Sequence, residues 1–80
     1  MAYRYKNIHE LTKELEEFHD IEFEYKKKQY SICPVNGIFA VGGKEMESIE
    51  YKTISDLVNN FKINGVFFKD IITEIDVYLH

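Results

Sequence analysis

Residues 21–52 alternate between apolar and polar side chains, and this alternation most constrains the fold that the chain can adopt. A hydrophobic period of about two residues favours half-buried β-strands. The segments that follow Asn7 and Thr53 instead have apolar residues every three or four positions, which indicates helices. We therefore predict an α+β fold in a single domain, residues 1–80, because a chain of this length holds only one hydrophobic core.

The first predicted helix has a clear start signal. Asn7 suits the N-cap position, and Glu10 three residues later completes a capping box. The apolar residues at helical spacing are Ile8, Leu11, Leu15 and Phe18. We expect this stripe to pack on the sheet, with the glutamates and lysines between its members facing solvent.

A small antiparallel meander is predicted next. The alternating segments are residues 21–25, 30–32 and 38–41, with 47–51 as a candidate fourth strand. Asn36-Gly37 is the strongest hairpin signal, because both residues tolerate the positive φ of a type I′ turn. The sequence thus predicts three or four strands in an antiparallel sheet.

Two short helices are predicted after the sheet. Thr53 is a suitable N-cap for the first, and Asn64-Gly65 is expected to stop it. The last helix is predicted from a stripe that comprises Phe68, Ile71, Ile72 and Ile75. The expected architecture is an N-terminal amphipathic helix packed on a three- to four-stranded antiparallel meander and followed by two short C-terminal helices, in the order α-β-β-β-(β)-α-α. We expect Phe18, Phe23, Phe61 and Phe68 to lie in its core.

Charge and composition exclude several classes of protein. The 80 residues carry a formal net charge of −4, so the chain lacks the basic footprint of a protein that wraps DNA or RNA. It has no apolar run near the roughly 18 residues of a membrane span, and residues 1–7 do not resemble a secretory signal. A lone cysteine fits a reducing compartment, and we expect a cytoplasmic protein without a membrane partner.

Residue usage also suggests an origin. The chain has nine lysines against one arginine and is rich in isoleucine, asparagine, tyrosine and phenylalanine, which AT-rich codons encode. This bias favours a bacterium or one of its mobile elements.

The sequence predicts no catalytic, cofactor or metal site. The histidines are dispersed without metal-ligand spacing, and the glycines form no phosphate-binding motif. Cys33 has no neighbouring base to activate its thiol. We therefore expect a protein that is not an enzyme.

The leading functional hypothesis is protein binding, because the chain has more aromatic residues than a core of this size needs. Tyr and Phe are enriched at interfaces, and carboxylates can attract a basic partner. The predicted partner-binding residues are Tyr3, Tyr5, Glu22, Glu24, Phe39, Phe67 and Tyr78. The expected function is that of a small acidic regulatory module, such as an inhibitor or immunity-type protein, whose partner is another protein or a second copy.

Two alternatives remain open. A nucleic-acid-binding module would use the basic hairpin tip and its flanking aromatics, namely Tyr25, Lys26, Lys27, Lys28 and Tyr30. The predicted order of a helix, three strands and a helix resembles double-stranded-RNA-binding domains in outline, although those domains start the second helix with lysines and this chain has Thr53-Ile54-Ser55-Asp56 there. The second alternative is a self-assembling homodimer with a structural role.

Overall fold

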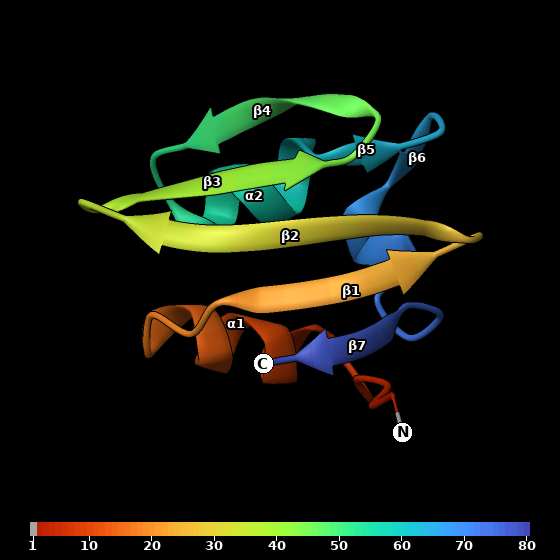
Figure 1. Ribbon diagram of the computed structural model, residues 1–80. Helices are drawn as coiled ribbons and strands as arrows, with labels where there is room; N and C mark the ends of the chain where they lie inside the picture. Colours follow the sequence, from red (N-terminus) through yellow and green to blue (C-terminus); the bar gives the residue numbers. More distant parts are fainter. Residues whose placement is uncertain (1) are drawn as a thin grey trace.

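The computed structural model describes residues 2–80, and its main feature is a five-stranded antiparallel sheet (Figure 1). The elements along the chain are α1 (Ile8–Glu16), β1 (Ile21–Tyr25), β2 (Lys28–Val35), β3 (Ile38–Gly43), β4 (Met46–Tyr51), α2 (Ile54–Asn60), β5 (Lys62–Ile63), β6 (Val66–Phe67), the 3-10 turn η1 (Phe68–Asp70) and β7 (Asp76–Leu79). The strand order is β4-β3-β2-β1-β7. The predicted α+β fold is confirmed, with four consecutive strands forming the meander and β7 added beside β1.

Both predicted helix starts are confirmed by their capping hydrogen bonds. The backbone N–H of Glu10 donates to Oδ1 of Asn7 at 3.2 Å, and the N–H of Asp56 donates to Oγ1 of Thr53 at 3.0 Å. Each side chain thereby satisfies one of the backbone donors that a helix leaves free at its first turn. The two helices therefore begin where the local sequence specifies.

The two faces of the sheet have different environments. Phe23, Ile32 and Val41 point to one face and belong to the same buried core as Leu15 of α1 and Leu57 of α2. Both helices therefore cover this inner face. The residues that alternate with these on the strands lie on the outer face, where the described residues place no helix.

Two-residue turns with positive φ connect three of the strand pairs. Asn36-Gly37, with φ of 50° and 83°, joins β2 to β3, as predicted. Asn64-Gly65, with φ of 52° and 79°, joins β5 to β6 and does not end a helix, since α2 already stops at Asn60. The prediction for Asn64-Gly65 was wrong because the same residue pair suits both a helix end and a hairpin turn. The third turn, Lys26-Lys27, has φ of 50° and 68°.

The predicted last helix is replaced by a short turn and a strand. Phe68, Ile71 and Ile75 are buried as expected, but only residues 68–70 are helical, as a 3-10 turn. Val77 then pairs with Phe23, and it exchanges two backbone hydrogen bonds of 2.8 Å with Tyr3 on its other side. Sheet hydrogen bonds with distant residues therefore override the helical spacing of the apolar side chains.

Phe18 is not a core residue, contrary to the prediction. Its side chain is 70% exposed, and its φ is 60°. Phe18 donates its N–H to the carbonyl of Leu15, and His19 donates to the carbonyl of Glu14, both at 3.0 Å, which closes the end of α1. The left-handed conformation turns the chain away from the helical stripe, and the ring leaves the core with it.

Replacing Phe18 with glycine should stabilise the protein. A side chain at positive φ costs about 1–2 kcal/mol, and glycine avoids this cost while losing some of the gain to its freer unfolded state. We expect the free energy of unfolding in urea to rise by roughly 0.5–1 kcal/mol. Phe18→Ala keeps the strained backbone and is the matched control. Equal stabilities of the two variants would contradict the assignment of strain to this position.

Candidate functional site

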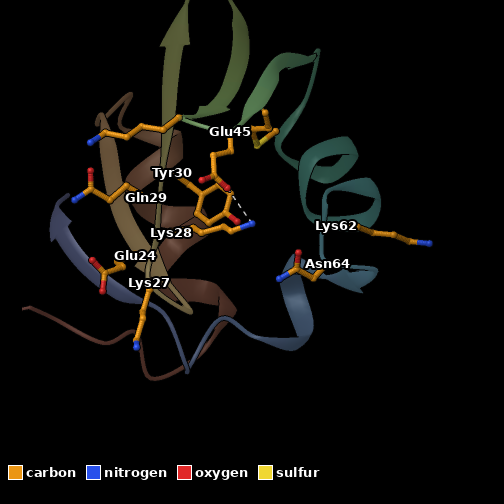
Figure 2. Close-up of a pocket in the computed structure, with 10 residues that line it drawn as sticks. Glu24, Lys27, Lys28, Gln29, Tyr30, Glu45, Lys62 and Asn64 are labelled. Atoms are coloured by element: carbon orange, nitrogen blue, oxygen red, sulfur yellow. Dashed lines mark ion pairs between the residues drawn. The ribbon is translucent and has the colours of Figure 1, made fainter.

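A hollow of about 380 Å³ lies between three hairpins at one end of the molecule (Figure 2). The turn of β1 and β2 supplies Lys27, the turn of β3 and β4 supplies Lys44 and Glu45, and the turn of β5 and β6 supplies Asn64. The complete lining is Glu24, Lys27, Lys28, Gln29, Tyr30, Lys44, Glu45, Met46, Lys62 and Asn64. We call this hollow the hairpin groove.

An ion pair and an aromatic ring lie in the middle of the hairpin groove. Nζ of Lys28 is 3.0 Å from Oε2 of Glu45, and this contact raises the pKa of Lys28. The ring of Tyr30 lies beside the pair and stacks on Phe23 in the core, with the ring centroids 5.3 Å apart. Asn64 faces the pair from β5–β6 (Figure 2). The Tyr30 ring therefore connects the hairpin groove to the packed core.

The remaining lysines of the hairpin groove extend toward solvent. In Figure 2, Lys27 and Lys62 point away from the hollow. Nζ of Lys62 lies 4.6 Å from the centre of the Phe67 ring, and Lys69 approaches the same ring at 5.5 Å. Four lysines against two glutamates leave the groove lining with an excess of two positive charges, although the whole chain is negative. This end of the molecule can therefore attract anions.

The outer face of the sheet has the opposite charge. Small residues occupy the middle of β2 and β3, where Ser31 pairs with Gly42 and Cys33 pairs with Ala40. Carboxylates on neighbouring strands surround them: Glu22 and Glu24 on β1, Glu50 on β4 and Asp76 on β7. Arg4 forms an exposed ion pair with Asp76 at 2.9 Å. The small residues leave a hollow of about 360 Å³ beside Ser31, Gly42 and Gly43, and carboxylates lie around it.

The structure separates the residues predicted to bind a protein partner. Glu22 and Glu24 lie on the outer face. Tyr78 lies on the neighbouring strand β7 where its register with β1 shifts, between Val77, which pairs with Phe23, and Leu79, which pairs with Glu22. Tyr78 is 59% exposed, as an interface residue requires. Of these three residues, Glu22 and Glu24 share one face of β1.

The other predicted partner-binding residues do not lie on that face. Tyr5 and Phe39 are core residues, 2% and 7% exposed, so their assignment to a surface is corrected. Phe39 lies opposite Tyr51 on the inner face, where the helices cover it. Tyr3 and Phe67 are half-buried at two separate places, beside β7 and in β6. The single core absorbs more aromatic rings than the sequence suggested.

The residues of the nucleic-acid alternative lie on or near the hairpin groove. Lys27, Lys28 and Tyr30 line it, and Nζ of Lys26 lies 5.5 Å from the centre of the Tyr25 ring. The ring of Tyr25 itself is buried on the inner face and is not free to stack on a base, which corrects its assignment. Sequence reasoning missed Lys44, Lys62 and Asn64. The Asn64-Gly65 pair, interpreted from the sequence as a helix stop, was a signal that could have predicted the third hairpin.

A network of tyrosine, glutamate and histidine joins both ends of the described chain to α1. The hydroxyl of Tyr3 donates to Glu10, and that of Tyr5 donates to Glu14. Nδ1 of His80 is 2.6 Å from Oε2 of Glu14, and its ring stacks on Tyr3 at 4.9 Å. The hydrogen bond from Tyr3 is the main cause of a lowered pKa for Glu10. Burial, followed by the hydrogen bond to Glu14, raises the pKa of Tyr5.

This network predicts a loss of stability at alkaline pH. A folded-state pKa above the unfolded value of about 10 means that the contribution of Tyr5 is complete below pH 10 and is lost as the pH rises further. The free energy of unfolding should therefore fall above about pH 10. Tyr5→Phe should lower stability at neutral pH and flatten the alkaline decline. An identical decline in the variant would show that Tyr5 is not the titrating group.

Within residues 2–80, no group of three or more His, Cys, Asp or Glu side chains is placed to hold a metal ion. Over the same residues, no helix has the length and apolar character needed to cross a membrane. Comparison with protein-family models, curated proteins and solved structures found no match to this chain.

Proposed function

We propose that this chain is a non-catalytic protein-binding module whose outer sheet face docks a basic protein. The observation that carries the proposal is the asymmetry of the sheet. Two helices cover its inner face, whereas the outer face combines small central residues with carboxylates from three strands. A surface of small side chains allows close approach of a partner, and the surrounding negative charge favours a positively charged one.

Tyr78 supplies an anchor of the type that interfaces favour. Its exposed ring lies on β7, the strand that pairs with β1, which carries Glu22 and Glu24. Tyrosine is enriched among residues that contribute most to binding, because it buries a large rigid surface and retains a hydroxyl for hydrogen bonding. We propose that Tyr78 packs against the partner while the carboxylates orient it.

The proposal extends to the biological role. A small acidic module that binds a basic protein can block that protein's own charged surface, as an inhibitor or immunity-type protein does. The residue usage that favours a bacterium or its mobile element, and the lone cysteine that fits a reducing cytoplasm, are consistent with this role. Regulation by occlusion needs no catalytic residue in this chain.

The test compares two variants with the same change of charge. The face variant combines Glu22→Lys with Glu50→Lys, and the control combines Glu16→Lys with Glu17→Lys on the exposed side of α1 and its end. A basic protein captured from bacterial lysate by the wild-type chain is identified, purified and titrated against all three proteins. We expect about tenfold weaker binding to the face variant, affinity that falls with added salt, and little change for the control.

Two results would overturn the proposal. One is equal affinity of the purified partner for the face variant and the wild type. The other is equal weakening by the control pair, because general attraction to negative charge would then explain the binding. Tyr78→Ala provides a separate readout, since it removes the anchor without changing the charge.

Assembly into a homodimer is a second candidate, favoured by one observation. Among residues 2–80, strand β4 pairs with β3 alone and is an edge of the sheet, so its outward backbone groups could pair with a second copy. Solution mass measured by light scattering over a concentration series tests this candidate directly. A monomer at every concentration would exclude it, while a dimer that Ile49→Pro disrupts would support it.

A further inference from the structure

In the part of the chain that the structure describes, three of the four two-residue turns between paired strands can be compared directly. All three have positive φ at both positions, which a type I′ turn requires. Two of them have Asn-Gly, the most favourable pair for this conformation, whereas the turn between β1 and β2 has Lys26-Lys27. Lysine does not favour positive φ, so this turn is less stable than an Asn-Gly turn would be. It places two lysine side chains at the hairpin tip.

The strained basic turn adjoins the hairpin groove, where further lysines gather. Lys27 belongs to both, and Lys28 begins the next strand inside the groove. Lys44 and Lys62 arrive from the other two hairpins, more than fifteen residues away in the sequence. The strained Lys26-Lys27 turn and the lysines of the groove therefore lie at the same end of the molecule, although the chain as a whole is negatively charged.

We propose that the hairpin groove binds a small anion that carries two or more phosphate groups. The positive excess of the lining matches a ligand with at least two negative charges. The side-chain amide of Asn64, which faces the ion pair, adds a neutral donor to phosphate oxygens (Figure 2). Lys27 and Lys62 have flexible four-carbon stems that can turn from solvent onto the ligand.

The size and surroundings of the groove favour a small ligand over a nucleic acid. Its volume of about 380 Å³ lies in the range of small-molecule sites, roughly 300–1,000 Å³. A strand of DNA or RNA that left the groove along the sheet would meet Glu22 and Glu24 on the outer face. These carboxylates would repel a long phosphate backbone, and of the two only Glu24 also belongs to the lining of the groove.

Lys28 is the centre of the proposed site. Its ammonium is paired with Glu45 at 3.0 Å, beside the Tyr30 ring (Figure 2). A phosphate entering the groove would share this ammonium with Glu45. The ion pair therefore positions Lys28 for the ligand, while the Glu45 carboxylate competes with the phosphate for the same ammonium. The proposal predicts that Glu45→Gln strengthens binding, because it removes negative charge and the competition for Lys28.

Calorimetric titration with inorganic triphosphate tests the site. The groove variant combines Lys44→Gln with Lys62→Gln, and the control combines Lys13→Gln with Lys52→Gln, which makes the same change of charge at exposed positions outside the lining. We expect measurable binding to the wild type, about tenfold or greater weakening in the groove variant, and at most a twofold change in the control. Thermal unfolding confirms that each variant is folded.

The turn variant gives a second, opposite pair of readouts. Lys26→Asn with Lys27→Gly restores the favoured turn, so its melting temperature should rise. Its affinity for triphosphate should nevertheless fall, by roughly threefold or more. A rise in both quantities would overturn the proposal, because the lysines would then be dispensable for binding.

Titrations with other ligands distinguish the classes of anion that the groove could bind. Equal binding of ATP and triphosphate would show that the phosphate chain is sufficient, and tighter binding of ATP would show that the groove also holds the nucleoside, both in support of the site. Binding of a single-stranded oligonucleotide more tightly than either, lost in the groove variant, would overturn the small-ligand proposal in favour of nucleic acid. Lack of binding by both triphosphate and ATP would also overturn it.

Discussion

Replacing Phe68 with alanine is expected to lower the free energy of unfolding by about 3–5 kcal/mol. The side chain is fully buried, and its ring packs between Phe23 at 5.3 Å and Phe61 at 5.4 Å. Its backbone N–H also donates to the carbonyl of Phe61 at 2.8 Å, which fixes η1 against the end of α2. Removal of the ring leaves a cavity where sheet, helix and turn meet. Since small domains are stable by about 5–15 kcal/mol, much of the native stability would be lost.

Urea unfolding followed by circular dichroism measures this effect. Phe18→Ala is the matched control, because it removes the same ring from a position that is largely exposed. We expect the control to change stability by no more than about 0.5 kcal/mol. If the two variants lost similar amounts, Phe68 would not be the centre of the core.

Leu15→Ala is expected to cost about 2–5 kcal/mol. Leu15 lies on the inner side of α1, is fully buried and belongs to the core that also contains Ile21 and Leu57. Alanine preserves the helix propensity, so the loss reports packing alone. The adjacent variant Glu16→Ala changes an exposed position of the same helix and serves as the control. A cost below about 0.5 kcal/mol for Leu15→Ala would contradict the packing of α1 on the sheet.

Local chemistry made much of this fold predictable. The caps at Asn7 and Thr53 satisfy donors within three residues, and the Asn36-Gly37 turn depends on the φ preferences of two neighbours. The alternation in residues 21–25 directly reports which side of β1 is buried. Each of these features is decided over a few consecutive residues, where sequence patterns are most informative.

The C-terminal region was not predictable in the same way. The stripe at Phe68, Ile71, Ile72 and Ile75 correctly marked buried side chains, but burial does not specify a helix when the chain can bury the same residues in a turn. The strand β7 exists because β1 offers a free edge to Val77. That edge is created by residues more than fifty positions earlier, and no local pattern contains it.

For the candidate sites, too, some residues were predictable from the sequence and others were not. Lys26, Lys27 and Lys28 were evident as a basic hairpin tip, and Glu22 and Glu24 as residues on the polar side of a strand. Their partners in space were not evident. Lys44 and Lys62 approach the basic tip only because β3–β4 and β5–β6 end at the same side of the molecule (Figure 2).

The sequence by itself thus determined where helices start, which strands alternate and where one tight turn lies, because short-range hydrogen bonds and φ preferences control these features. Only the tertiary structure decided that Phe18 leaves the core, that Tyr5 and Phe39 enter it, and that the ends of the described chain meet on α1. It also decided which charges share a surface. These outcomes depend on contacts between distant segments, whose free energies a linear pattern does not contain.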